Sequence, residues 1–397
     1  MDNLPILDME KKNSINIIWI YSGTLADSLD KATWLSTTKS LRDLGCKVTL
    51  LNAEQKNCTT IDGVEVKCIP TSNIYFLGKL FFHLKAILII LSQWRNLDII
   101  LFHPDSVLFI LPLRFFRVLI YHKRPLFVVD IRTVHMTSAG ENNWKMCLRK
   151  IYFDLMQRVT SQWADGQTAI TYRLAKVVSI PQDKIWGIWQ SGVDLDYFMI
   201  CQSMRKWAED NDPLHLMYIG TMNDGRNLMG FSRAVKIATD EGLKFIMTYI
   251  GDGFERAALE KFAQDNPNII HVHPPIPHKE IPNWLAKAHV GILPFPDEVK
   301  FQVSSPIKLF EYMAAGIPIL ATRIACHTDV IGDGKYVFWA EGADVDSLKD
   351  ALHLIYTQRG SLAAMGRLAA ENAPKWTWAA SAQNLKSALE QGLERYA

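Results

Sequence analysis

Short apolar runs that alternate with amphipathic helical patterns constrain this chain more than any other feature. In the first half, a helical pattern over 34–46 ends at Gly45 and lies between two runs of strand length. The strand-length runs of this half are 15–21, 47–52, 97–102 and 126–131. Because parallel strands are joined by helical crossovers, this alternation predicts an α/β protein with a doubly wound sheet.

The second half repeats the plan. Its predicted strands are 214–220, 244–253, 268–273, 289–295 and 317–322, and its predicted helices are 229–240, 254–264, 279–288 and 304–316. A chain of 397 residues is too long for one core and suits two domains. We therefore expect two Rossmann-like doubly wound domains, at 1–195 and 196–374, that face a cleft at the carboxyl ends of both sheets. We expect the long amphipathic helix in 375–397 to cross back onto the first domain.

Composition and cysteine usage narrow the class of protein. The net charge is only +2, so global charge does not suggest a nucleic-acid partner. The six cysteines are scattered without a C-x-x-C pair, which predicts reduced cytosolic thiols rather than a disulfide framework or a zinc site. The first 21 residues carry acids before a short apolar run, so we expect no export signal.

The stretch 74–124 is rich in aromatic residues and carries seven basic and two acidic residues. Its two most apolar segments, 76–94 and 107–125, are broken by Lys or Arg, so we predict no membrane span. Two interpretations remain open at this stage. The stretch forms either a basic surface that contacts an anionic membrane or helices that cover a sheet with solvated basic ends.

The segment SSPIKLFEYMAAGIPILAT, residues 304–322, has the pattern of a helix start followed by a strand. Ser304 and Ser305 suit the cap, and Lys308 and Glu311 fall one turn apart. A helix start offers free N–H groups to a phosphate, and a carboxylate further along can accept hydrogen bonds from a ribose diol. The alternative is an exposed i,i+3 ion pair, worth ~0.2–0.5 kcal/mol.

The same segment closely resembles the most recognisable motif of the GT-B glycosyltransferases, in particular glycosyltransferase family 4. Four further segments resemble motifs of that family: IWQSGVDLDYF, LHLMYIGTMNDGRNL, TYIGDGFERAALE and IPHKEIPNWLAKAHVGILPF. The resemblance covers 185–378. It implies that residues 1–195 bind an acceptor and residues 196–374 bind a nucleoside diphosphate sugar, whose sugar is transferred to an acceptor hydroxyl. It also implies no cofactor besides this donor substrate.

The resemblance assigns roles to matching positions. Glu311 corresponds to the residue that binds the donor's ribose, while Arg226, Lys308 and the amides at Ser304 and Ser305 would hold and neutralise the departing diphosphate. The remaining expected donor contacts are Gly220, Thr221, Gly251 and Gly253.

Three positions depart from the family pattern. Thr221 stands where the family has Arg, and Arg226 where it has Lys. Val303 stands where the family often has a Glu that contacts the sugar. These departures leave the donor sugar open. Family 4 retains the anomeric configuration, and we expect retention here.

Candidate acceptor-side residues follow the strand at 126–131. Asp130 could serve as a base in an inverting reaction, His135 could serve as a base near neutral pH, and Arg132 lies between them. The alternatives are a capping Asp, an Arg paired with it and an ordinary loop His. Gly23, after the first strand, is a weaker candidate for a cleft contact.

Two D-x-D sequences resemble metal-binding motifs of the other large glycosyltransferase fold. We assign 194–196 to the domain junction and 344–346 to a helix cap, and we predict no essential metal. The predicted activity is that of a metal-independent glycosyltransferase of bacterial-type surface polysaccharide or lipid-linked glycan assembly. We place it in the cytoplasm at the inner face of the membrane, with possible contact through 74–124 and no nucleic-acid partner.

Two competing functions remain open. A sugar-nucleotide 2-epimerase has the same fold and would isomerise the donor without an acceptor. A non-catalytic nucleotide-sugar-binding subunit would suit the departures at Thr221 and Val303.

Overall fold

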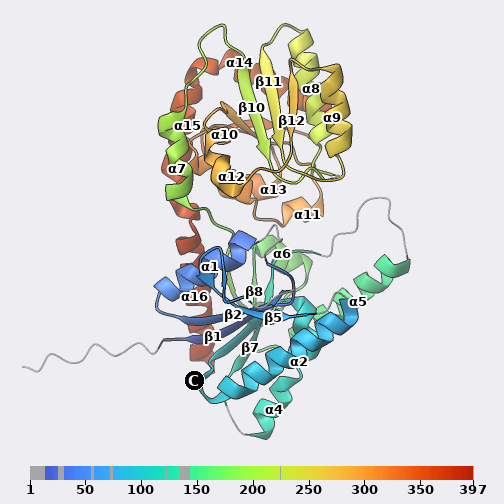
Figure 1. Cartoon of the computed structure of the whole chain (residues 1–397), viewed down its shortest axis with the longest axis vertical. Helices are drawn as coiled ribbons and strands as arrows, with labels where there is room; N and C mark the ends of the chain where they lie inside the picture. The colour runs from blue at the N-terminus through green and yellow to red at the C-terminus, as the bar shows by residue number, and fades with distance from the viewer. Residues whose placement is uncertain are drawn as a thin grey trace, which may run out of the picture.

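The computed structural model describes most of the chain and divides it into two α/β domains, each built on a parallel sheet (Figure 1). The described residues are 14–25, 31–54, 58–71, 75–120, 123–134, 144–223 and 225–396. The α/β class and the two doubly wound sheets expected from the sequence are confirmed.

The first domain contains a seven-stranded sheet of order β5-β2-β1-β6-β7-β8-β9. Its strands are β1 (Asn16–Tyr21), β2 (Lys47–Glu54), β5 (Lys67–Pro70), β6 (Ile99–Phe102), β7 (Leu126–Ile131), β8 (Gly166–Ala169) and β9 (Ile185–Ile188). A small antiparallel hairpin, β3 (Thr60–Ile61) and β4 (Val64–Glu65), stands outside this sheet. The strand order reverses between β1 and β6, which is where ligands of doubly wound sheets bind.

The second domain contains a six-stranded sheet of order β12-β11-β10-β13-β14-β15. Its strands are β10 (Leu214–Ile219), β11 (Phe245–Ile250), β12 (Ile270–His273), β13 (Val290–Leu293), β14 (Ile319–Thr322) and β15 (Val337–Ala340). The order reverses between β10 and β13. Both switch points face the space between the domains.

Helices cover both faces of each sheet. Those of the first domain are α1 (Lys31–Asp43), α2 (Tyr75–Gln93), α3 (Val107–Ile110), α4 (Leu113–Leu119), α5 (Trp144–Trp163) and α6 (Tyr172–Val177). Those of the second are α7 (Leu195–Met204), α8 (Leu228–Asp240), α9 (Arg256–Asp265), α10 (Ile281–Leu285), α11 (Val299–Gln302), α12 (Ile307–Ala314), α13 (Ala325–Ile331), α14 (Val345–Thr357) and α15 (Leu362–Asn372). Helix α16 (Trp378–Arg395) follows them.

Alternation along β1 divides the core of the first domain between the two sheet faces. Ile17 and Trp19 pack with α1 and α16, whereas Ile18 and Ile20 pack with α2 and α3. Period-two alternation in a fully buried strand places neighbouring residues on opposite faces. The second core also includes Val303, a residue of the second domain that is 2% exposed. The two domains therefore share apolar packing.

Helix α16 returns to the first domain and packs on α1 and β9 (Figure 1). The Trp186 ring lies in the space that side chains at Gly166 or Gly392 would occupy. At the start of α16 the Val193 N–H donates to Trp376 O at 2.8 Å, and the Trp378 N–H donates to Val193 O at 3.3 Å. These two bonds join the segment that leaves the first domain to the segment that returns.

The expectation that all cysteines are reduced is wrong for one pair, because Cys58 and Cys68 form a disulfide. The β3–β4 hairpin folds the chain back and brings their Cα atoms to 5.2 Å. A search for C-x-x-C spacing misses such a pair, since a hairpin can join cysteines ten residues apart. Cys46, Cys201 and Cys326 are free thiols and are buried.

One helical segment among the described residues, Leu77–Asn96, is long and apolar enough to cross a membrane by length and composition alone. A third of it is buried within the protein. Phe82, Ala86 and Ile90 are fully buried and belong to the core of the first domain. That side of the helix therefore packs as a helix that covers a sheet.

Candidate active site between the domains

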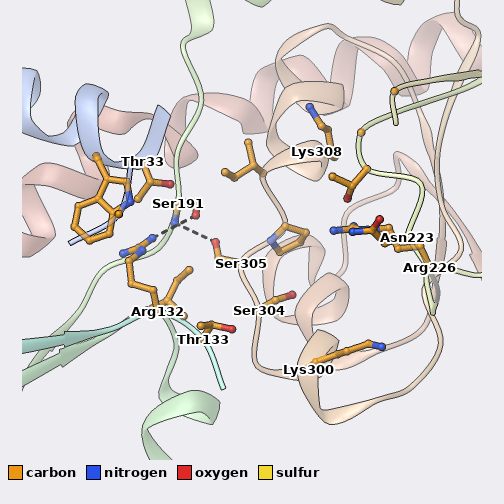
Figure 2. A pocket seen from close by; sticks show the side chains of 18 of the residues that line it. Thr33, Arg132, Thr133, Ser191, Asn223, Arg226, Lys300, Ser304, Ser305 and Lys308 are labelled. Atoms are coloured by element: carbon orange, nitrogen blue, oxygen red, sulfur yellow. Dashed lines mark hydrogen bonds between the residues drawn. The ribbon is translucent and has the colours of Figure 1, made fainter. Parts of the chain in front are cut away.

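A cleft of about 1320 Å³ lies between the domains. Its walls are residues that follow the carboxyl ends of strands in both sheets, among them Gly23, His103 and Arg132 of the first domain and Gly220 and Gly251 of the second. Figure 2 shows Arg132 and Ser191 facing Ser304, Ser305 and Lys308 across the cleft.

We call the part of the cleft around the start of α12 the donor half and the part walled by the first domain the acceptor half, after the contacts expected in each. Ser304, Ser305 and Lys308 line the donor half. The two serines do not cap the helix as expected. The Ser304 hydroxyl donates to Phe301 O at 2.8 Å, the Ser305 hydroxyl accepts from the Ser191 N–H at 3.0 Å, and Pro306 occupies the cap position without a side-chain hydrogen bond. An uncapped helix start offers its N–H groups and its positive end to an anion.

Lys308 and Glu311 form an ion pair, with 2.6 Å between Nζ and Oε2. Glu311 is only 8% exposed and, unlike Lys308, is not among the cleft-lining residues, so this is not the fully exposed pair considered as an alternative. Burial raises the pKa of the neighbouring Tyr197 hydroxyl to about 12, and the charge of Glu311 adds to the rise. A diol that binds the Glu311 carboxylate would either share that carboxylate with Lys308 or displace the Lys308 ammonium from it.

Two glycine turns bring backbone close to the same place. A Cβ at Gly251, where φ is +149°, would lie 1.9 Å from Gly220 O, so these strand ends can meet only without a side chain. A Cβ at Gly220 would lie 3.6 Å from Lys308 Cε, which places the lysine directly over this turn. Thr221 also lines the cleft, whereas Gly253 is not among the lining residues and packs against Met222 O.

Arg226 lines the cleft on the far side of the donor half. Its guanidinium lies 5.2 Å from the centre of the Phe295 ring. Lys300, which the sequence analysis missed, lines the cleft beside it and pairs with Glu298 at 2.7 Å. The donor half thus gathers Arg226, Lys300 and Lys308 around the start of α12 (Figure 2).

In the acceptor half, Arg132 rather than Asp130 reaches the cleft. Asp130 is fully buried, and its Oδ1 accepts hydrogen bonds from Thr168 Oγ1 at 2.7 Å and Trp189 Nε1 at 2.9 Å. Burial raises the pKa of Asp130. Arg132 stacks on Trp189 at 3.8 Å from the ring centre, and its Nη2 donates to Ser191 Oγ at 3.4 Å. Asp130 therefore contacts Thr168, Trp189 and Arg132 but not the cleft, and His135 lies outside the described residues.

His103, Lys79 and Asp105 line the acceptor half and were missed. Lys79 Nζ lies 3.5 Å from Asp105 Oδ2, and burial lowers the pKa of His103. His103 directly follows the predicted strand at 97–102. The search for polar residues after a strand, which selected Asp130, Arg132 and His135, could therefore have found it. Gly23 also lines the cleft, and a Cβ there would meet the Tyr21 ring at 2.7 Å.

Each D-x-D sequence stands at the start of a helix. The Asp194 carboxylate caps α7 by accepting from the Tyr197 N–H at 3.2 Å, and the Asp344 carboxylate caps α14 by accepting from the Ser347 N–H at 2.8 Å. Within the described ranges, no three side chains of His, Cys, Asp or Glu gather as a metal ion would require.

Comparison with known proteins finds a family model that matches most of the second domain. Residues 213–358 match the family model described as glycosyl transferases group 1. The D-inositol 3-phosphate glycosyltransferase of Paenarthrobacter aurescens (strain TC1) is 26% identical over 198 residues, which are 47% of this chain and 47% of that protein. The chain thus matches about half the length of this curated relative.

Solved structures with similar folds extend over nearly the whole chain. The catalytic domain of starch synthase IV from Arabidopsis thaliana, bound to ADP and acarbose, gives a TM-score of 0.70 at 13% identity and covers 96% of this chain and 100% of that one. Anabaena Alr3699/HepE in complex with UDP-glucose gives 0.68 at 11% identity and covers 95% and 99%. The chain therefore has the GT-B fold of these structures, and its residues 213–358 match the family model of the group 1 glycosyl transferases.

Proposed function

We propose that this protein transfers a sugar from a nucleoside diphosphate sugar to an acceptor hydroxyl, without a metal ion or a resident cofactor. The observation that carries the proposal is the uncapped start of α12, which opens into the cleft with Lys308 beside it and Arg226 opposite. The structural relatives that bind ADP and UDP-glucose support a nucleotide-sugar donor.

The donor half suits a leaving diphosphate. The N–H groups at the start of α12, the Lys308 ammonium and the Arg226 guanidinium would meet the negative charge that develops as the glycosidic bond breaks. Preorganised donors of this kind are often the largest catalytic contribution, and each charge-assisted hydrogen bond contributes ~1.5–3 kcal/mol. Glu311 would accept hydrogen bonds from the ribose diol.

We propose retention of the anomeric configuration. The inverting alternative assigned a base to Asp130, but that carboxylate is buried and does not line the cleft. Asp130 instead lies 4.0 Å from Arg132, whose side chain it helps to position.

Calorimetric titration of UDP, GDP and ADP tests the donor site. We expect one nucleotide to bind without added metal, and Glu311→Ala to weaken that binding roughly tenfold or more because two ribose hydrogen bonds are lost. Glu341→Ala is the matched control, since Glu341 is an exposed glutamate that pairs with Arg323. The proposal is wrong if no nucleotide binds or if Glu311→Ala binds as tightly as the wild type.

We propose a glycan or lipid-linked glycan as the acceptor, in the assembly of a bacterial-type surface polysaccharide. The protein would act in the cytoplasm at the inner face of the membrane, with peripheral contact through 74–124. Chromatographic separation followed by mass spectrometry of the donor, with and without such acceptors, separates the alternatives, because an isomerised donor keeps its mass and differs only in retention. Isomerised donor without acceptor would indicate an epimerase, and binding without transfer or hydrolysis would indicate a non-catalytic subunit.

A further inference from the structure

The exposed apolar side chains of this protein are concentrated on one part of the first domain. More than half of the exposed large apolar side chains in the described chain come from residues 75–163. Among monomeric soluble proteins, a large contiguous patch of this kind marks an interaction site. The stretch 74–124 accounts for only part of it, because α5 contributes as well.

The patch follows helix geometry on two helices. On α2, Leu77, Phe81, Leu84 and Leu88 are each more than half exposed, at a spacing of four, three and four residues that forms one stripe. On α5, Leu148, Ile151 and Leu155 are exposed to the same degree at a spacing of three and four. The opposite side of α2 is buried in the core, so the stripe is an outer face and not a membrane span.

Helix α3 connects the two stripes. It contacts both α2 and α5, and its Leu108 is exposed between them. The adjoining α4 adds Phe115, Val118 and Leu119. In Figure 1, α2, α4 and α5 lie on the side of the first domain away from α1 and α16. We call the exposed apolar residues of α2, α3, α4 and α5 the apolar face.

Cations accompany the apolar face. The Lys85 ammonium lies over the Phe81 ring, 5.3 Å from the ring centre, so a cation stands beside the apolar stripe. Arg95 follows α2 and Arg158 follows Leu155 on α5, and both are exposed. Apolar side chains bordered by Lys and Arg suit the interface of an anionic bilayer better than a protein surface.

The apolar face begins at the edge of the cleft. Leu77 is the first residue of the exposed stripe, and the next two residues, Gly78 and Lys79, line the acceptor half of the cleft. Lys79 pairs with Asp105 there, close to His103. A bilayer against α2 would therefore border the entrance that leads to the acceptor half.

We propose that the apolar face docks on an anionic bilayer and that the cleft takes an acceptor anchored in that bilayer, whose polar head enters beside Gly78 and Lys79. This inference rests on the proposed sugar transfer for the identity of the acceptor. The docking itself needs only the surface. The expected acceptor class is an amphiphile, with its sugar-accepting head in the cleft and its apolar chain in the membrane below α2.

Vesicle flotation of the full chain tests the docking. We expect the wild type to float with vesicles of phosphatidylcholine and phosphatidylglycerol and much less with phosphatidylcholine alone. Leu84→Asp combined with Leu88→Asp should lower vesicle binding roughly tenfold or more, since two apolar side chains leave the interface and two charges enter it. The matched control is Met199→Asp combined with Ile200→Asp on α7, where both side chains are about half exposed.

Three results would overturn the docking. The first is a wild type that binds neither vesicle type. The second is an α2 double variant that floats as well as the wild type. The third is a wild type that does not bind vesicles but self-associates, when the α2 double variant does not self-associate. The last result would identify the apolar face as a protein interface. Titration of UDP, GDP and ADP on the same variants separates the two proposals, because nucleotide binding should be unchanged by the α2 substitutions.

The position of the cleft entrance is tested separately. A fluorophore attached to Leu77→Cys should be quenched by spin-labelled lipids as strongly as one at Leu88→Cys, with labelled wild type as the background. A fluorophore at Phe254→Cys, on a fully exposed side chain of the second domain, should not be quenched. Quenching at position 88 without quenching at position 77 would show that the entrance lies away from the bilayer and would overturn the anchored acceptor.

Discussion

At the residue scale, Arg132 is the side chain of the acceptor half whose position is most completely determined. Trp189 supports its guanidinium from one side, Ser191 accepts a hydrogen bond from it, and Asp130 lies behind it. Ser191 in turn donates its N–H to Ser305 at the start of the donor site. Arg132 is thus coupled to both halves of the cleft.

We expect Arg132→Lys to lower the rate of donor hydrolysis or transfer roughly tenfold or more, because lysine keeps the charge but loses the planar stack and the fixed fork of donors. Nucleotide affinity should change little, since Arg132 does not belong to the donor half. Steady-state kinetics and titration of the same protein measure both. Arg367→Lys, on the exposed face of α15, is the control. Unchanged kcat in Arg132→Lys would show that Arg132 has no part in the reaction.

The sequence could predict the donor residues better than the acceptor residues for a physical reason. Ser304, Ser305 and Lys308 lie within one short segment, and helix geometry alone brings them together. Arg132, Trp189 and His103 each follow a different strand, and only the pairing of these strands in the sheet brings their ends to one edge. Residue type did not separate buried Asp130 from cleft-lining Arg132, because Asp130 still lies within β7 whereas Arg132 lies just beyond its end, where the chain enters the cleft.

At the scale of elements, strongly patterned segments were predictable and short buried strands were not. The runs at 126–131 and 214–220 correspond to β7 and β10 within a residue. The apolar run VFWA of β15 could have been predicted as a strand, whereas β8 and β9 have four residues each and contain Gly, so no uninterrupted apolar run marks them. Their pairing in the sheet, and not their local preference, makes them strands.

The packing of α16 gives a prediction at this scale. We expect Gly392→Val to lower the free energy of unfolding by about 2 kcal/mol, because the added side chain would overlap the Trp186 ring between α16 and the sheet. Urea unfolding followed by circular dichroism measures the change. Gly360→Val is the control, since no atom lies within 4 Å of the Cβ it would add. Equal losses in the two variants would mean that the contact with Trp186 is not responsible.

At the scale of the whole molecule, Val303 shows why the family pattern alone misassigns a position. The family often has a sugar-contacting Glu there, but in this chain the side chain is buried with the core of the first domain, and the Val303 carbonyl accepts from Thr171 Oγ1 at 2.8 Å. The residue joins the two domains. Its apolar character follows from that packing, which no local pattern reveals.

We therefore expect Val303→Glu to lower the free energy of unfolding by about 3 kcal/mol, because it buries a carboxylate among apolar side chains without a partner. Val299→Glu, at the start of the short helix α11 that ends just before Val303, is half exposed, should cost little and is the control. Chemical unfolding measures both. A Val303→Glu variant that is as stable as the wild type and binds the donor sugar more tightly would place this side chain in the cleft after all.

The two hydrogen bonds at Val193 have a mechanical consequence. The chain passes between the domains twice, and Val193 pairs with Thr377 as a parallel bridge where the two passages meet. A single connecting segment would let one domain rotate about any axis relative to the other. Two connecting segments that are hydrogen-bonded to each other restrict the rotation mainly to one hinge axis. A protease that cut only one of the two connecting segments would leave the domains joined through the other. The remaining segment would still restrict how the cleft opens and closes.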